Sequence, residues 1–283
     1  MPSPTTHPEH VSSPASATDG VRFIPDNYIP WFGGWFRRYS VRKLAKSFFA
    51  VRTTTDSYDL AEAPADRPMI VALTHAASWD PLLSMALHEL YRSESRPTGP
   101  MDADQLERFD VFKRVGVFGV DPADPASLEA MRTHVLKLFD DEPGASLWLT
   151  PQGAFADPRA PLVVRPGMAA VAAAAEGVTV VTLAVEYAFW VDLKPEIFLC
   201  ARRAEPERTS TAGWQRAIVA AFEDARTNLA DKVIARDPEA FDVLLGGDAV
   251  KTNPVWDLVM KLRGKSGSIE PRAARAKRET ENG

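Results

Sequence analysis

The chain has 283 residues, of which 45% are hydrophobic and 25% charged, and its formal net charge at pH 7 is -5. This composition is that of a globular protein with a substantial core, and it excludes disorder of the whole chain. The acidic balance argues against a nucleic-acid-binding protein, which usually carries a basic domain. The single cysteine, Cys200, excludes an internal disulfide and a four-cysteine zinc site. We expect Cys200 to be a buried, inert thiol in a reducing compartment.

The first twenty residues predict a disordered polar tail. They have neither the basic start nor the apolar run of a secretory signal. No window of the chain reaches the roughly 18 uncharged apolar residues that a membrane-spanning helix requires. We therefore expect a cytoplasmic protein that contacts a membrane, if at all, from its surface.

Residues 21–55 stand out because they are basic and aromatic in a chain that is acidic overall. Residues 21–52 hold seven Arg or Lys, one Asp and nine aromatic residues. Four apolar residues fall on one predicted helical face while the basic residues Arg42, Lys43 and Lys46 fall elsewhere. The apolar residues are Val41, Leu44, Phe48 and Val51. Together with Trp31, Phe32, Trp35 and Phe36, this pattern predicts an amphipathic helical segment in an anionic membrane interface. The alternative is an N-terminal helix packed on the domain.

Strand-like and helical patterns alternate through residues 56–245. Strands are predicted at 68–74, 115–120, 146–150, 178–187 and 196–203. Helices are predicted at 81–91, 125–139, 167–176 and 211–235, the last with Trp214, Ile218, Ala221 and Phe222 as its buried stripe. Such alternation predicts a single α/β domain with a central, mostly parallel sheet flanked by helices.

Residues 246–283 predict a C-terminal amphipathic stretch and a basic tail. Residues 261–278 contain seven Lys or Arg and one Glu. The tail is interpreted either as a second membrane contact or as a solvated, frayed end.

His75 follows the apolar run of residues 69–73, and Asp80 lies five positions later. In open α/β sheets, ligands collect outside the carboxyl ends of the strands, which is where the pattern places His75. A neutral imidazole is suited to remove the proton of an attacking hydroxyl, and a carboxylate on its other nitrogen fixes the tautomer. The alternative for Asp80 is a helix N-cap, because Pro81 follows it. His88 and His134 lie in helical patterns and are assigned core or surface roles.

The sequence lacks the nucleophile motif of an α/β hydrolase, G-x-S-x-G, and "RGKSGS" at 263–268 lacks the first glycine of a phosphate-binding loop. Direct attack by a substrate hydroxyl is the simpler hypothesis.

Four short blocks occur in order along residues 68–187: "THAASWDP", "GVFGVDP", "LTPQGAF" and "VTLAVEY". In these blocks the chain resembles the glycerophospholipid acyltransferase family, and in particular its lysophosphatidate acyltransferases. The resemblance implies that His75 is the general base and Asp80 its partner. It further implies that the turn of Pro151, Gln152 and Gly153 helps to form the acceptor or oxyanion side of the pocket. The other substrate-binding residues that it implies are Ser78, Trp79, Gly116 and Phe118.

Two of the blocks depart from the family pattern. Pro122, Gln152 and Phe155 stand where the family has the Arg, Glu and Arg associated with a phosphate-bearing acceptor. A phosphate could be bound instead by Arg159 and Arg165, or by Arg114, since Arg offers a bidentate fork. The alternatives are that these arginines are surface residues and that the acceptor is uncharged, such as a glycolipid or a glycosylated terpenoid.

Together these observations predict an O-acyltransferase peripherally attached to the cytoplasmic face of an anionic membrane. It would move a fatty acyl group from acyl-coenzyme A or acyl carrier protein to a hydroxyl of a lysophospholipid or glycolipid. No metal or bound cofactor is expected, and no nucleic acid. The alternatives are an acyl ester or thioester hydrolase that uses the same His75 and Asp80, and a membrane lipid-binding protein without catalysis.

Overall fold

The computed structural model describes residues 21–190 and 192–247. Within them one nine-stranded sheet has the order β1-β5-β4-β6-β3-β7-β8-β2-β9. The strands are β1 (Phe23–Ile24), β2 (Ala50–Thr54), β3 (Met69–Leu73), β4 (Pro97–Asp102), β5 (Val117–Val120), β6 (Ser146–Leu149), β7 (Thr179–Ala188), β8 (Glu196–Arg203) and β9 (Phe241–Gly246).

The sheet is mixed but mostly parallel, which confirms the predicted fold class. The five strands β5, β4, β6, β3 and β7 run parallel to one another, and β2 runs parallel to β8. Antiparallel pairs join β7 to β8 and attach β1 and β9 at the two edges. The strand predicted at 196–203 coincides with β8, and the other four predicted strands correspond to β3, β5, β6 and β7.

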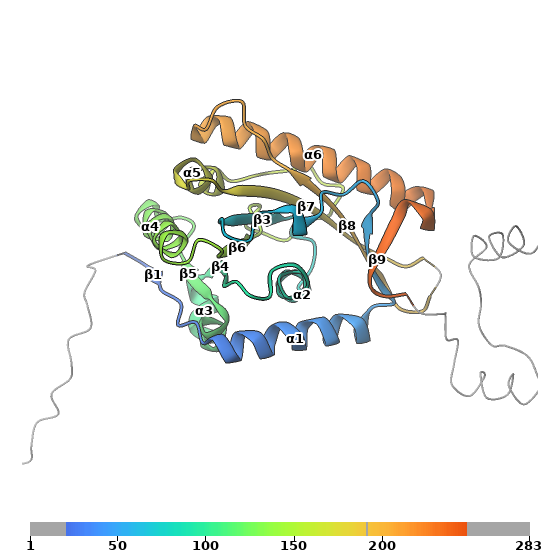
Figure 1. Ribbon diagram of the computed structural model, residues 1–283, viewed down its shortest axis with the longest axis horizontal. Coiled ribbons are helices and arrows are strands. Elements are labelled where there is room, and N and C mark those ends of the chain that lie inside the picture. The colour runs from blue at the N-terminus through green and yellow to red at the C-terminus, as the bar shows by residue number, and fades with distance from the viewer. Residues whose placement is uncertain (1–20, 191, 248–283) are drawn as a thin grey trace, which may run out of the picture.

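Helices cover both faces of the sheet (Figure 1). They are α1 (Pro30–Ser47), α2 (Asp80–Arg92), α3 (Ala103–Arg108), α4 (Pro125–Asp141), α5 (Gly167–Ala174) and α6 (Thr211–Ala235), with 3-10 turns η1 (Leu60–Glu62), η2 (Asp110–Val115) and η3 (Pro238–Ala240). We call the face covered by α2 and α1 the near face, and the face covered by α4, α5 and α6 the far face. None of the helices in the described part of the chain is long and apolar enough to cross a bilayer.

Strand β3 shows how the sequence builds two cores. Met69, Val71 and Leu73 pack into the near-face cluster, whereas Ile70 and Ala72 pack into the far-face cluster. All five side chains are fully buried. A central parallel strand that is buried on both faces is expected to be a continuous apolar run, as this one is.

Residues 21–55 do not form a segment apart from the domain, so the expected boundary at 55/56 is corrected. Strand β1 pairs with β5, and β2 lies inside the sheet between β8 and β9. Helix α1 ends at Ser47, so Phe48 and Val51 lie beyond it. Leu44, Phe48 and Val51 are buried in the near-face core, with Val41 packed against them. The predicted apolar stripe therefore faces the protein interior and not a membrane.

Two expectations about the rest of the chain have different outcomes. Cys200 is buried on β8, as expected, and burial raises the pKa of its thiol. The predicted tail of residues 1–20 lies outside the described residues. So does the C-terminal basic tail, because the described part ends at residue 247, one residue after β9.

Candidate active site

The candidate base lies where the central strand leaves the sheet. Strand β3 ends at Leu73, and Thr74 extends its pairing with β7 through two bonds: its N–H donates to the Leu183 carbonyl, and its hydroxyl accepts from the Val185 N–H. His75 follows at once and lies at the carboxyl end of β3, beside the start of α2. The loop from β3 to α2 is short, so it brings Asp80 back to His75.

His75, Asp80 and Tyr187 form one hydrogen-bonded chain. Asp80 Oδ2 lies 2.8 Å from His75 Nδ1 and accepts from the Ala77 N–H at 3.1 Å, while Oδ1 accepts from the Tyr187 hydroxyl at 2.6 Å. The Asp80 side chain is 1% exposed and that of His75 18%. The carboxylate therefore fixes the ring, and it lies in a buried position where its remaining acceptor sites are filled.

Asp80 does not act as the helix N-cap that its place before Pro81 also allowed. It is the first residue of α2, and Trp79 holds the N-cap position without a side-chain cap bond. The carboxylate points back to Ala77, His75 and Tyr187. Its role is thus toward the imidazole and not toward the helix end.

Tyr187 joins this group from β7, a strand that the sequence placed correctly without assigning the tyrosine a role. Burial raises the pKa of its hydroxyl strongly, and the charge of Asp80 raises it further. The phenol therefore remains a proton donor at neutral pH. Tyr187 lies 107 residues from Asp80 along the chain, so no local sequence pattern could indicate this contact.

The turn of Pro151, Gln152 and Gly153 lies next to His75. Gln152 Oε1 accepts from the His75 backbone N–H at 2.6 Å, so the Gln152 side chain holds the backbone of the base. Gly153 has a positive φ of 71°, a conformation that favours glycine, and its N–H donates to the Thr150 carbonyl. The N–H groups of Ala154 and Phe155 find no backbone acceptor in the described part of the chain.

Phe155 stacks on the imidazole of His75, a contact that sequence reasoning missed. The two ring centroids are 4.1 Å apart with an interplanar angle of 30°, and Phe155 is 60% exposed. The loop that carries it is tied down, because the Ala156 N–H donates to the His75 carbonyl and Arg226 donates to the carbonyls of Pro158 and Ala160. An exposed aromatic ring is thus fixed beside the base.

The two arginines of this loop differ in their surroundings. The Arg159 side chain is 92% exposed and lies 3.9 Å from Asp157, which is the geometry of a surface residue. The Arg165 guanidinium lies against the turn, where a Cβ added to Gly153 would come within 2.8 Å of its Cζ. Among the described residues no carboxylate pairs with Arg165. Of the two, Arg165 is the one that the structure brings to the turn beside His75.

The remaining predicted residues divide into neighbours of the site and residues remote from it. Ser78 is exposed in the loop between His75 and Asp80. Trp79 packs edge-on against Phe48, and Lys43 Nζ lies 6.0 Å from the Trp79 ring centroid.

Gly116 and Phe118 require a correction. Strand β5 is separated from β3 by β4 and β6. Gly116 is buried against the Pro97 carbonyl, and Phe118 is fully buried in the far-face core. Neither is placed to contact a substrate at His75. Arg114 belongs to the same region, where its carbonyl accepts from the Ile29 N–H.

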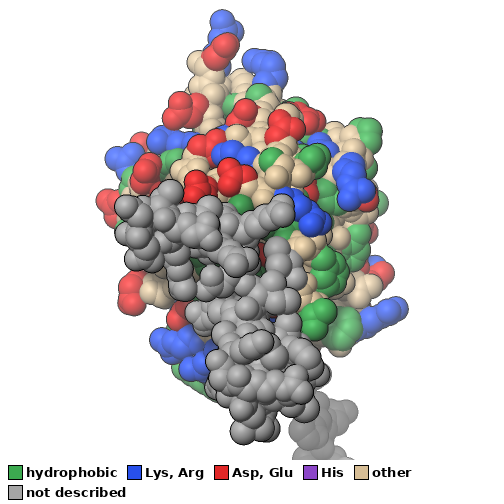
Figure 2. Space-filling model, turned by 90° about the vertical axis from the view of Figure 1, so that its right-hand side faces the viewer, with side chains coloured by type: hydrophobic (Ala, Val, Ile, Leu, Met, Phe, Trp, Pro, Cys, Tyr) green, Lys and Arg blue, Asp and Glu red, His purple; other side chains and the backbone are tan. Residues whose placement is uncertain are grey.

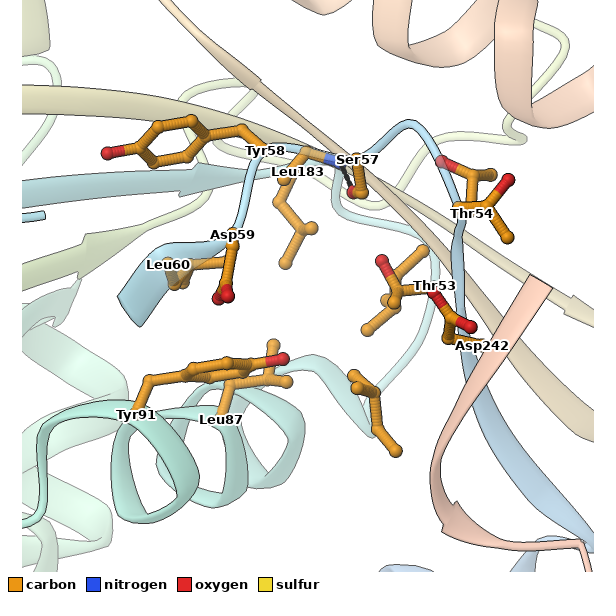
Figure 3. Close-up of a pocket in the computed structure, with 14 residues that line it drawn as sticks. Thr53, Thr54, Ser57, Tyr58, Asp59, Leu60, Leu87, Tyr91, Leu183 and Asp242 are labelled. Atoms are coloured by element: carbon orange, nitrogen blue, oxygen red, sulfur yellow. Dashed lines mark hydrogen bonds between the residues drawn. The ribbon is translucent and has the colours of Figure 1, made fainter. Parts of the chain in front are cut away.

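A cavity of about 320 Å³ opens on the near face, between α2 and strands β2, β7, β8 and β9 (Figure 3). Leu87 and Leu183 form part of its apolar wall, and Asp59, Tyr91 and Asp242 contribute polar groups. The lining contains two carboxylates and neither Lys nor Arg, so it is unsuited to a phosphate. His75 does not line it.

The comparisons with known proteins show similarity to solved structures and to no family model or curated protein. The chain is similar to the crystal structure of the 1-acyl-sn-glycerophosphate (LPA) acyltransferase PlsC from Thermotoga maritima, with 13% sequence identity and a TM-score of 0.46. The similarity covers 70% of this chain and 79% of that chain. It assigns no role to any residue of this chain.

Proposed function

We propose that the protein is an O-acyltransferase that moves a fatty acyl group from an acyl thioester to a hydroxyl of a lipid-like acceptor. The observation that carries the proposal is the hydrogen bonding of the two ring nitrogens of His75. Its Nδ1 is held by the buried carboxylate of Asp80, while Nε2 has no hydrogen-bond partner among the described residues. An imidazole fixed in this way presents a lone pair to a substrate proton.

The same geometry favours attack by a substrate hydroxyl over attack by the protein. A serine or cysteine nucleophile would be hydrogen-bonded to the base. Within the described residues none is bonded to His75, and Ser84 donates its hydroxyl to the Asp80 carbonyl instead. The acceptor itself is therefore proposed as the nucleophile.

The reaction is balanced with these groups alone. His75 Nε2 takes the hydroxyl proton as the acceptor oxygen bonds to the thioester carbon. The carbon–sulfur bond then breaks, and the thiol of coenzyme A or acyl carrier protein leaves with the proton from Nε2. Asp80 stabilises the imidazolium between these steps. The free N–H groups of Ala154 and Phe155 are proposed as donors to the oxyanion, where one donor is typically worth about 100- to 1000-fold in rate.

Two observations bear on the acceptor. Phe155 offers an exposed ring beside the base, which favours an uncharged headgroup such as a glycolipid or glycosylated terpenoid. Arg165 offers a guanidinium at the same turn, which favours the phosphate of a lysophospholipid. The variant Arg165→Met distinguishes the two kinds of acceptor. It should impair acylation of a phosphate-bearing acceptor and leave acylation of an uncharged one intact. We further propose that the protein works on the cytoplasmic face of a membrane, where both donors occur.

The first experiment measures acyl transfer by the purified wild type and His75→Ala. Labelled acyl-coenzyme A or acyl carrier protein is supplied with a mixed extract of polar and neutral lipids, and products are resolved by mass spectrometry. We expect a labelled lipid that falls by at least about 100-fold in the variant. The matched control is His134→Ala, since His134 also lies 3.7 Å from a carboxylate, that of Asp26, but away from the site.

The other outcomes decide between the alternatives. Free labelled fatty acid without an acylated lipid identifies a hydrolase that uses the same pair. Turnover that is absent with both carriers, or equal in wild type and His75→Ala, rejects the transferase in favour of a lipid-binding protein.

A further inference from the structure

We propose that the outer face of α1 together with η2 is a docking surface for an anionic lipid bilayer. We call it the aromatic face, and it comprises Trp31, Phe32, Trp35, Phe36, Tyr39, Phe109, Val111 and Phe112. Four of these residues, Trp31, Phe32, Trp35 and Phe36, belong to the segment that the sequence predicted to bind a membrane, whereas the apolar stripe predicted on the same segment is buried. The docking surface goes beyond the proposed acyl transfer and stands independently of it.

The aromatic face is continuous across two elements. Trp31 is 74% exposed and Trp35 52%, and Tyr39 stacks on Trp35 with ring centroids 5.8 Å apart. The ring centroids of Phe36 and of Phe112 in η2 are 6.2 Å apart, with the rings edge to face. Val111 of η2 and Phe109, the N-cap residue of η2, are also exposed. Contiguous exposed apolar groups of this kind mark an interaction site on a protein surface.

Packing on the opposite side of α1 fixes the rotation of the helix. Leu44 is fully buried, and Arg37 is held by Glu89, by the Tyr28 hydroxyl and by the Ser93 carbonyl. Helix α1 cannot turn its tryptophans inward without breaking this buried ion pair and its hydrogen bonds, because Trp35 lies on the far side of the helix from these groups. The exposure of the aromatic rings is thus built into the fold.

The charges around the aromatic face match an anionic partner. Helix α1 contains five basic residues and no acidic one. Arg37 and Arg38 pair with Glu89 of α2, whereas Arg42, Lys43 and Lys46 have no carboxylate partner among the described residues. Arg42 and Lys46 are exposed and continue, at helical spacing, the row of Trp31, Trp35 and Arg38. In η2, Asp110 is accompanied by Lys113 and Arg114. Each basic residue near an anionic membrane surface contributes about 1 kcal/mol.

A bilayer interface fits this combination better than another protein. Tryptophan and tyrosine are enriched where a membrane meets water, because their rings are apolar with a polar edge. A basic helix with an aromatic face, in a described part of the chain whose helices do not span a bilayer, is the pattern of a peripheral anchor. Near the C-terminal end of α1, Lys43 Nζ lies 6.0 Å from the ring centroid of Trp79, the residue before Asp80.

The experiment measures binding of the full-length protein to sedimented vesicles of phosphatidylcholine, alone or mixed with phosphatidylglycerol. We expect binding to the anionic vesicles that weakens as salt is raised. The double variants Trp31→Ser/Trp35→Ser and Arg42→Glu/Lys46→Glu should each lower the partition coefficient by at least about tenfold. The matched control is Ile234→Ser/Arg216→Glu, which alters an exposed apolar and an exposed basic residue on α6.

A second readout locates the contact directly. Brominated lipids quench tryptophans that enter the interface, and we expect quenching in the wild type. Trp31→Phe/Trp35→Phe should keep the binding and lose most of the quenching. Persistent quenching in that variant, or wild-type binding by the serine variant, overturns the proposal. So does a wild type that is dimeric without vesicles and that the serine variant makes monomeric, because the face would then join two copies.

His75→Ala separates this proposal from the proposed function. The variant should bind vesicles like the wild type, whatever its activity. Loss of vesicle binding in the serine variant supports the docking surface even if no acyl transfer is found.

Discussion

The two long helices α1 and α6 lie on opposite faces of the sheet and differ in whether their large apolar residues are buried or exposed. In α6, Trp214, Ile218 and Phe222 all face the far-face core. Its outer side carries charges of both signs, and Arg226 and Lys232 pair with carboxylates. Figure 2 shows acidic and basic side chains interspersed over the upper part of the molecule, where α6 lies in Figure 1.

In α1, by contrast, two tryptophans point outward and no acidic residue accompanies them. Both helices bury an apolar stripe, so burial alone does not distinguish them. The difference lies in what each sequence places on its outer side: mixed charge suits water, whereas aromatic and basic residues suit an anionic interface. The outer face of a helix, and not its amphipathicity, is therefore the informative feature here.

The sharpest test of this contrast is stability. Phe222→Ala on α6 removes a fully buried ring and should lower the free energy of unfolding by about 3–5 kcal/mol. Trp35→Ala on α1 removes a larger but exposed ring and should change it by less than about 0.5 kcal/mol. Urea denaturation of both variants measures the difference. If Trp35→Ala proves as destabilising as Phe222→Ala, the aromatic face is packed against protein and the contrast fails.

The stripes of α6 and the strand β8 were predictable from sequence because local pattern and packing agree there. In residues 211–235 the apolar spacing is helical throughout, Ser210 caps the start through the Gly213 N–H, and the helix occupies the predicted range. In residues 196–203 a short apolar run predicts β8, which the structure buries almost throughout.

Other elements were not predictable, because tertiary pairing overrides their local signal. Strand β4 contains two prolines and a glycine, yet it lies inside the sheet between β5 and β6. The helical spacing of Val41, Leu44, Phe48 and Val51 continues past the end of α1, so β2 was absorbed into the predicted helix. For the site, the sequence predicted His75 and Asp80. It missed the contacts of Tyr187 and Phe155, which depend on strands and loops distant along the chain.

The pH dependence of the free energy of unfolding tests whether His88 is buried and neutral on the near face. His88 on α2 is fully buried: its Nε2 lies 3.0 Å from the Ser95 carbonyl, and its Nδ1 accepts from the Trp148 indole. Burial lowers the pKa of this imidazole to about 3. In the unfolded chain the His88 imidazole has an ordinary pKa near 6.5, so between about pH 6.5 and pH 3 it is protonated in the unfolded chain and neutral in the folded one. The free energy of unfolding therefore falls as pH drops below about 6.5.

The expected loss from this one group is about 2 kcal/mol between pH 7 and pH 5. His88→Gln removes the titration, so its free energy of unfolding should depend less on pH over that range by the same amount. Urea denaturation at the two pH values checks this, with His134→Ala as the control that retains His88. An unchanged pH dependence in His88→Gln would mean that the imidazole is protonated in the folded protein.

The smallest effect is expected from Tyr187, whose hydroxyl binds the carboxylate that orients His75. Tyr187→Phe removes the hydroxyl that donates to Asp80 Oδ1 at 2.6 Å and leaves the ring in place. A hydrogen bond to a charged group is worth about 1.5–3 kcal/mol, and the lower end of this range corresponds to roughly a tenfold fall in kcat, which we expect with little change in KM. Tyr91→Phe, on the same face at the cavity, is the matched control. If both variants keep the wild-type kcat, Ala77 and His75 alone hold Asp80, and the role of Tyr187 is its packing against Phe48.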